Sequence, residues 1–136
     1  MRDIGLLPHQ HAFVADEQSS VVVLKGGFRA GKTVAAVVKA LQMADRAYPL
    51  PVVVMEPTYR MVERVFIETA RRMFGQWHIP FEWLKASAEL VAWPGTARPL
   101  RMLCVSAERP ETIMGITAGG GLVDEWELCG EEAVVA

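Results

Sequence analysis

Apolar residues along the chain fall into two kinds of stretch, short continuous runs and longer stretches with helical spacing. Continuous runs occupy residues 21–24 and 52–55, and such runs suit parallel strands that are covered on both faces. Between them, residues 32–46 place apolar side chains three and four positions apart, and this stretch ends before Pro49, as expected of a helix. The pattern predicts a strand, a helix and a second strand in succession, which indicates an α/β fold.

The next stretch, residues 58–74, predicts another helix because its apolar positions form a stripe. The polar face of this stretch mixes charges of both signs. Arg64 with Glu68, and Glu68 with Arg72, stand four positions apart, which is the spacing of ion pairs on a helix. We therefore interpret this face as solvated surface rather than as a DNA-binding stripe.

The following segment predicts two strands joined by a turn. Residues 90–93 and 101–105 flank Pro94-Gly95-Thr96, a turn signal that indicates a β-hairpin or a strand pair. A last strand is expected to lead into Asp124. The three glycines at 119–121 count against this strand, because glycine is a poor strand former.

Length and composition limit the chain to a single domain, residues 1–136. The 136 residues with 51% hydrophobic content can bury one core and leave little room for a second. The net charge of −2 argues against the chain as a whole being an electrostatic partner of nucleic acid. Cys104 and Cys129 show neither CxxC spacing nor a histidine cluster, so we expect buried free thiols. The chain has no stretch long enough to span a bilayer and no signal pattern, which predicts a cytosolic protein.

A glycine-rich segment between the first predicted strand and the first helix carries the clearest chemistry. Residues 26–33, GGFRAGKT, fit the phosphate-binding pattern G-x-x-x-x-G-K-S/T in the strand-to-helix context that the pattern requires. The glycines allow successive backbone N–H groups to converge on phosphate oxygens. Lys32 would lie against the β and γ phosphates, and Thr33 would offer its hydroxyl to Mg²⁺ at the helix N-terminus. The predicted nucleotide contacts here are Gly26, Gly27, Phe28, Arg29, Ala30, Gly31, Lys32 and Thr33.

An acidic pair stands at the end of the last predicted strand. Leu122-Val123-Asp124-Glu125 resembles a Walker B element, in which an apolar strand ends in an acid at its carboxyl edge. Asp124 would hold Mg²⁺, usually through water, and Glu125 would polarise the water that attacks the γ phosphorus. Adjacent acids are common on surfaces, but the phosphate-binding loop earlier in an α/β pattern makes a catalytic role the better explanation.

The order of these segments resembles the ATPase domain of the large subunit of tailed-phage terminases, the motor that drives DNA into procapsids. The resemblance covers nearly the whole chain, and the combination of segments is more specific than any part except the phosphate-binding loop. It implies a P-loop NTPase fold of the ASCE or RecA-like type, a three-layer α/β sandwich with a mostly parallel sheet, here incomplete. Its parts are the glutamine-containing segment 7–13, the loop GGFRAGKT, the segment VVVMEPTYR, the hairpin at 93–105, and SAERPETIMG leading to GLVDE.

The resemblance also implies cofactors, site roles and partners. It places Gln10 on the adenine, Thr33 and Asp124 on Mg²⁺, and Lys32, Arg29 and Glu125 in catalysis, with ATP as the nucleotide. Arg29 would contact the γ phosphate or report its loss through its several donors; alternatively it packs outside the loop and pairs with an acid, and both readings stay open. The implied partners are double-stranded DNA, the portal protein, the small terminase subunit and further copies in a ring, in the bacterial host cytoplasm and without a membrane.

Two features depart from the family pattern. Terminases often carry an Arg-Gly pair before the acidic strand that supplies an arginine to the neighbouring subunit, whereas this chain has Met114-Gly115, with Arg109 as the nearest candidate. Loss of an arginine finger costs about 10³ to 10⁵ in turnover in related phosphoryl-transfer systems. The chain also ends soon after Glu125, so we expect a truncated ATPase domain without the nuclease domain. Its incomplete sheet is expected to expose an edge strand or an apolar face unless something covers it.

Two alternative functions stay open on the sequence. A helicase-like or DNA-repair ATPase is supported by Glu56-Pro57-Thr58, which resembles the segment after the second strand of superfamily helicases. A non-hydrolysing nucleotide-binding remnant is supported by Met114, the triple glycine and the early end of the chain.

Overall fold

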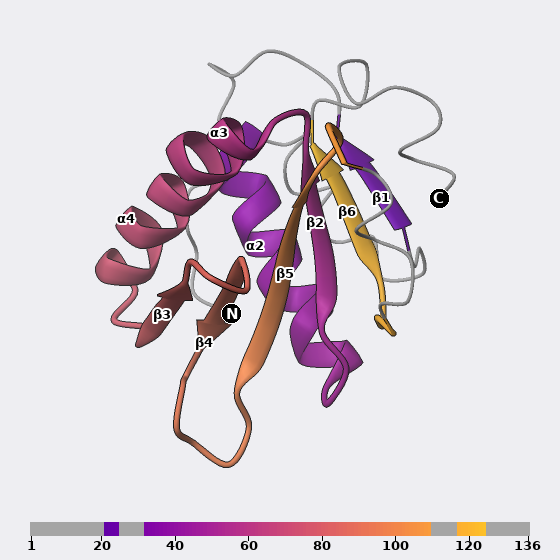
Figure 1. The fold of residues 1–136 in the computed structure, drawn as a ribbon. Helices are drawn as coiled ribbons and strands as arrows, with labels where there is room; N and C mark the ends of the chain where they lie inside the picture. Colours follow the sequence, from indigo (N-terminus) through magenta and orange to yellow (C-terminus); the bar gives the residue numbers. More distant parts are fainter. Residues whose placement is uncertain (1–20, 25–31, 110–116, 125–136) are drawn as a thin grey trace.

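A six-stranded sheet forms the centre of the computed structural model, which describes residues 21–24, 32–109 and 117–124. Its strand order is β1-β6-β2-β5-β4-β3 (Figure 1). The first four strands in this order run parallel, and β4 and β3 are antiparallel to their neighbours. The strands are β1 (Val21–Leu24), β2 (Val52–Glu56), β3 (Phe81–Leu84), β4 (Glu89–Ala92), β5 (Leu100–Ser106) and β6 (Gly121–Asp124).

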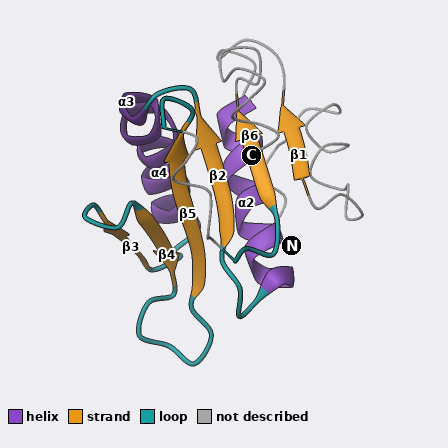
Figure 2. Cartoon of the chain, turned by 45° about the vertical axis from the view of Figure 1, so that its right-hand side comes forward, coloured by secondary structure: helices purple, strands orange, loops and turns teal. Residues whose placement is uncertain are grey.

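The helices of the described residues cover one face of this sheet: α2 lies behind the strands in Figure 1, and the turned view of Figure 2 shows both α2 and α4 behind them. They are α2 (Lys32–Ala47), α3 (Tyr59–Met61), the π-helix η2 (Val62–Ile67) and α4 (Glu68–Gln76). The sheet is one layer and these helices are a second, so the described residues form two layers of the expected three-layer sandwich. The predicted α/β fold with a mostly parallel sheet is confirmed.

The core lies between the sheet and the helices. β2 is buried along its whole length, which is the reason for its continuous apolar run. Ala36 and Ala40 of α2 are small and fully buried, so this helix approaches the sheet closely. Phe66 and Phe74 fill the space beneath η2 and α4. In the described residues, no helix is long and apolar enough to cross a membrane.

The second helical region begins directly after β2. Thr58 caps it, because its Oγ1 accepts the Met61 N–H at 3.1 Å, and Glu108 Oε1 accepts the Tyr59 N–H at 3.0 Å. Such caps satisfy N–H groups that have no partner within the helix. The predicted helix over residues 58–74 is confirmed in place, but the sequence did not indicate the π-helical turn within it.

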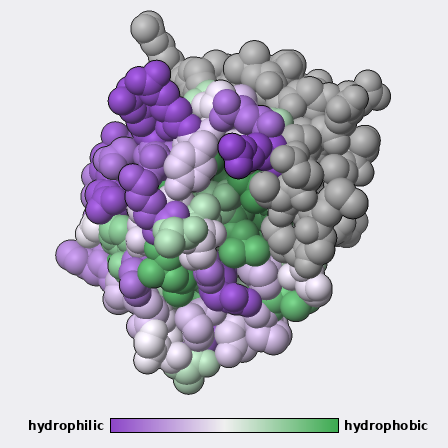
Figure 3. All heavy atoms as spheres, viewed as in Figure 1, coloured by the Kyte–Doolittle hydropathy of each residue, from purple (hydrophilic) through white to green (hydrophobic). Residues whose placement is uncertain are grey.

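The ion pairs predicted on this helical region are wrong. Glu68 lies 3.7 Å from Arg71, and neither Arg64 nor Arg72 is its partner. The π-helical turn changes the spacing of side chains around Arg64. The guanidinium carbon of Arg71 also lies 5.9 Å from the centre of the Phe81 ring. The solvated character is nevertheless as expected: these arginines are exposed, and Figure 3 shows a hydrophilic surface over the helices.

The predicted strand pair after this helix is confirmed, and the structure adds one strand to it. β4 pairs antiparallel with β5, with Leu90 opposite Met102. The missed strand is β3, which pairs antiparallel with β4 and forms the sheet edge. Its alternation of Phe81 and Trp83 with Glu82 was the available signal, although four residues are too few for a firm prediction from periodicity.

The three consecutive glycines do not interrupt β6, because the strand begins only at Gly121. Gly119 and Gly120 instead bring the chain close beneath the end of α2. The Gly119 N–H donates to Pro51 O at 2.9 Å, and Gly120 O accepts from the Val53 N–H at 3.0 Å. A Cβ on Gly119 would collide with the Cβ of Ala47, whereas a Cβ on Gly121 would make only an ordinary contact.

These two glycines therefore give a matched pair of substitutions. We expect Gly119→Ala to lower the free energy of unfolding by about 1–3 kcal/mol, because α2 and the loop must move apart. Gly121→Ala, the same chemical change, should be neutral or stabilising by about 0.4–1 kcal/mol. Urea denaturation of both variants measures the difference, and equal effects would contradict the close packing against Ala47.

Candidate functional site

The carboxyl ends of the parallel strands lie along one edge of the sheet, at the top of Figure 1. β6 pairs in parallel with β1 on one side and with β2 on the other. In this register Asp124 is level with Leu24, the last residue of β1. Ligands of open parallel sheets bind at this edge. The end of β6 also lies near the first residue of α2 at this edge.

The first turn of α2 brings a lysine to the end of β6. Lys32 Nζ lies 3.1 Å from Asp124 Oδ1, and the two side chains are 3% and 0% exposed. Both charges are removed from water, so their attraction is stronger than that of a surface pair. The structure thus joins the last residues of the glycine-rich segment to the acidic end of β6.

Thr33, next to Lys32 in the first turn of α2, is also buried. Of the predicted site residues, the structure therefore describes Lys32, Thr33 and Asp124, and it brings Lys32 and Asp124 into contact. The candidate arginine for a neighbouring subunit, Arg109, is exposed beyond β5. The remaining predicted positions lie outside the described residues: Gln10, Gly26, Gly27, Phe28, Arg29, Ala30, Gly31, Met114 and Glu125.

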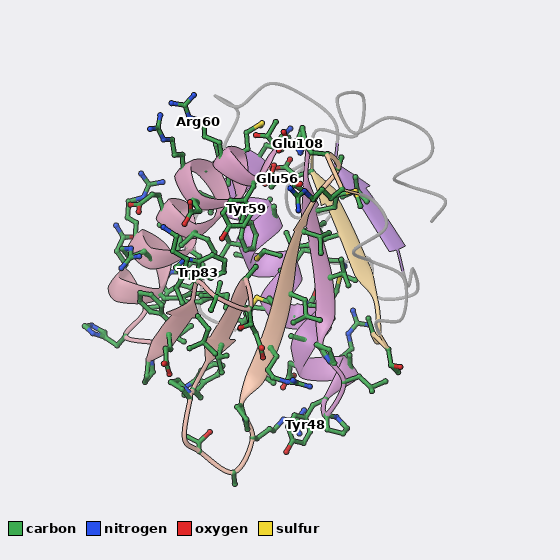
Figure 4. The ribbon with its side chains drawn as sticks, viewed as in Figure 1. Tyr48, Glu56, Tyr59, Arg60, Trp83 and Glu108 are labelled. Carbon is green, nitrogen blue, oxygen red and sulfur yellow. The ribbon has the colours of Figure 1, made fainter. Side chains whose placement is uncertain are left out.

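A residue that the sequence reasoning did not assign to the site is Glu56, which closes β2 and is fully buried. Figure 4 shows it at the carboxyl edge of the sheet. An acid that ends a buried apolar strand was a signal in the sequence. Glu56 lies near Asp124 only because β2 and β6 are neighbouring strands. The periodicity of apolar residues in the sequence does not reveal which strands are neighbours.

The donors at this edge fit Mg²⁺. The hydroxyl of Thr33 and the carboxylates of Asp124 and Glu56 are hard oxygen ligands, which Mg²⁺ prefers. In the part of the chain that the structure describes, no group of three or more His, Cys, Asp or Glu residues could hold a metal ion. Mg²⁺ usually takes one or two carboxylates and completes its shell with water and phosphates.

Cys104 on β5 is a buried free thiol, as predicted. Burial raises its pKa far above the usual value, and the negative charge of Glu56 raises it further. The thiol therefore stays protonated near neutral pH and is not a nucleophile. The prediction for Cys129 lies outside the described residues.

A hollow of about 920 Å³ lies beside the end of β5. Tyr59, Lys85, Ser106 and Glu108 are among the residues that line it, and Lys32 and Asp124 are not. Burial raises the pKa of Tyr59, and the charge of Glu63 adds to this shift. The hollow is therefore separate from the Lys32–Asp124 contact.

Comparisons with known proteins place the fold. The chain matches no protein-family description and no curated protein. It is similar to the large terminase from a thermophilic bacteriophage, with 18% identity and a TM-score of 0.74 over 96% of this chain and 34% of that chain. It is also similar to the large terminase ATPase domain of Thermus phage P74-26, with 19% identity and a TM-score of 0.59 over 89% of this chain and 53% of that one.

The chain thus spans about a third and about half of these two structures, respectively. Identity at this level establishes the fold and no more. The expected resemblance is confirmed in that respect: the chain has the P-loop NTPase-type α/β fold of phage large terminase ATPase domains.

Proposed function

We propose that the chain binds ATP with Mg²⁺ at the carboxyl edge of its sheet and hydrolyses it, as the ATPase part of a terminase-like DNA-packaging motor. The observation that carries this proposal is the buried contact between Lys32 and Asp124 at 3.1 Å. It joins the Gly-Lys-Thr sequence to the acidic end of β6 within a terminase ATPase fold. Together these would form the two halves of a nucleotide site.

The roles in binding follow from charge and position. The backbone of residues 26–31 would surround the phosphates, and Lys32 would balance the charge of the β and γ phosphates. Thr33 and Asp124 would hold Mg²⁺, which neutralises phosphate charge when bound. Arg29 would contact the γ phosphate and Gln10 the adenine.

Hydrolysis would use Glu125, which directly follows Asp124 at the end of β6. Its carboxylate would orient a water molecule in line with the γ phosphorus and accept the proton as the water attacks. Little covalent chemistry falls to the protein in such a reaction, and most of the rate comes from positioning and charge stabilisation. The buried carboxyl edge of the sheet, where Lys32 meets Asp124, would provide both positioning and charge stabilisation.

At the level of the whole protein, we propose that residues 1–136 act as one ATPase unit to which no nuclease function is assigned. The proposed partners are double-stranded DNA, the portal protein, the small terminase subunit and other copies of the chain in a ring. The setting would be the bacterial host cytoplasm. Contacts with the DNA would go mainly to its phosphates and depend little on sequence.

The test is ATP turnover by the full chain with Mg²⁺, measured without DNA, with double-stranded DNA and with single-stranded DNA. We expect hydrolysis that requires Mg²⁺ and that double-stranded DNA stimulates more than single-stranded DNA. Stimulation by single-stranded DNA alone would favour the helicase-like alternative. ATP binding without turnover under any condition would favour a non-hydrolysing nucleotide-binding protein.

A further inference from the structure

A second acidic residue, Glu56, lies at the same level of the sheet as Asp124. β2 and β6 are adjacent parallel strands in which Met55 is opposite Val123. The next residues along the two strands, Glu56 and Asp124, are therefore level with each other. Neighbouring strands are about 4.8 Å apart, so the two acids lie side by side, and both are 0% exposed.

The two acids also point to the same face of the sheet. Side chains alternate between faces along a strand, so Glu56 shares the face of Val54, and Asp124 shares that of Leu122. Val54 and Leu122 belong to the core beneath the helices. Both carboxylates therefore lie in the row directly beyond that core, on the side where α2 begins.

The neighbouring strand β5 supports this orientation independently. Glu56 is paired in register with Ser106, two residues beyond Cys104, which belongs to the same core. The charge of Glu56 adds to the effect of burial in raising the pKa of the Cys104 thiol. The carboxylate of Glu56 thus lies close to the helical side of β5 as well as beside β6.

This arrangement has a chemical consequence for the site of Lys32 and Asp124. Two carboxylates in one buried row, with Lys32 Nζ at 3.1 Å from one of them, supply hard oxygen atoms of the kind that Mg²⁺ prefers. Mg²⁺ keeps several waters when it binds. Outer carboxylates that hydrogen-bond to such waters orient them and tune the affinity for the ion.

We propose that Glu56 is a positioning residue for the divalent cation that accompanies ATP, acting from β2 through the water around the ion, beside Asp124 on β6. This inference rests on the proposed function. It adds a third element to a site that the sequence assigned to the glycine-rich loop and β6.

The test is the Mg²⁺ dependence of nucleotide binding by the full chain. The affinity for a fluorescent ATP analogue is measured in EDTA and then over a series of Mg²⁺ concentrations, for the wild type, Glu56→Gln and Glu82→Gln. We expect Glu56→Gln to keep the wild-type affinity for the ATP analogue in EDTA. It should need an Mg²⁺ concentration about 10- to 100-fold higher than the wild type to reach half of the increase in affinity that Mg²⁺ produces. Glu82→Gln, the same change at an exposed position of β3, should follow the wild type.

The outcomes separate this inference from the proposed function. An unshifted Mg²⁺ midpoint in Glu56→Gln would overturn the role of Glu56 and leave the ATP site intact. No nucleotide binding by the wild type would reject the proposed function and this inference with it.

A second measurement uses the wild type alone, so it does not depend on whether Glu56→Gln folds. Fe²⁺ replaces Mg²⁺ in the ATP complex, added hydrogen peroxide is reduced by the bound Fe²⁺ to hydroxyl radicals, and ascorbate returns the Fe³⁺ to Fe²⁺. The peptide bonds that these radicals cut are mapped by mass spectrometry. Cuts near both residue 56 and residue 124 are expected. Cuts near residue 124 without any near residue 56 would contradict the inference.

Discussion

Lys32→Met is expected to lower the free energy of unfolding by about 3–5 kcal/mol, the usual effect of removing one partner of a buried ion pair. The ammonium of Lys32 lies 3.1 Å from Asp124 Oδ1, and both side chains are almost fully buried. Methionine keeps most of the aliphatic stem, so packing changes little while the charge of Asp124 loses this partner. Urea denaturation followed by circular dichroism measures the change.

Two further variants show whether the effect comes from the buried charge. Lys32→Met combined with Asp124→Leu should recover most of the lost stability, because an apolar pair can replace a buried ion pair without cost. Lys85→Met is the matched control, since Lys85 is 74% exposed and lies 3.7 Å from Glu63; its effect should stay within about 1 kcal/mol. If Lys32→Met and Lys85→Met were equally mild, the burial of the Lys32–Asp124 contact would be contradicted.

Glu125→Gln is expected to reduce ATP turnover by about 10²- to 10⁴-fold, the usual contribution of a general base. Glutamine has nearly the same size and still forms hydrogen bonds, but it cannot accept the proton of the attacking water. The affinity for ATP should therefore remain close to that of the wild type. Single-turnover hydrolysis, with ATP binding measured on the same samples, separates the two effects.

The control for this variant is Glu127→Gln, the same chemical change two residues further along the chain. It should leave both turnover and affinity unchanged. Equal turnover in the wild type and in Glu125→Gln would reject hydrolysis through Glu125, whereas a fall in ATP affinity would indicate a role in binding instead.

The parts of the fold that were predictable from the sequence are those whose pattern repeats over enough residues. β2 is buried on both faces and reads as a continuous apolar run, and α2 shows helical spacing over 16 residues. β3 has only four residues, too few for a firm assignment. The π-helical turn η2 was not predictable either, because its apolar stripe resembles that of an α-helix.

The residues that meet at the candidate site were predictable from the sequence where a local motif marks them and not where strand order brings them together. Lys32 and Asp124 were assigned from short motifs, and the structure brings them into contact. The level position of Glu56 beside Asp124 depends on β6 lying between β1 and β2, a long-range pairing without a local signal. The requirement for glycine at position 119 was equally unpredictable, because it comes from the packing of this position against Ala47 at the end of α2.

The most direct test of the nucleotide site is a calorimetric titration of the full chain with ATP and Mg²⁺. It compares the wild type with the Lys32→Met and Asp124→Leu double variant, which is a folded control once the urea denaturation described above has shown the expected recovery of stability. We predict saturable binding by the wild type and no detectable binding by the double variant. Equal affinities of the two proteins for ATP would contradict a nucleotide site at the carboxyl edge of β6.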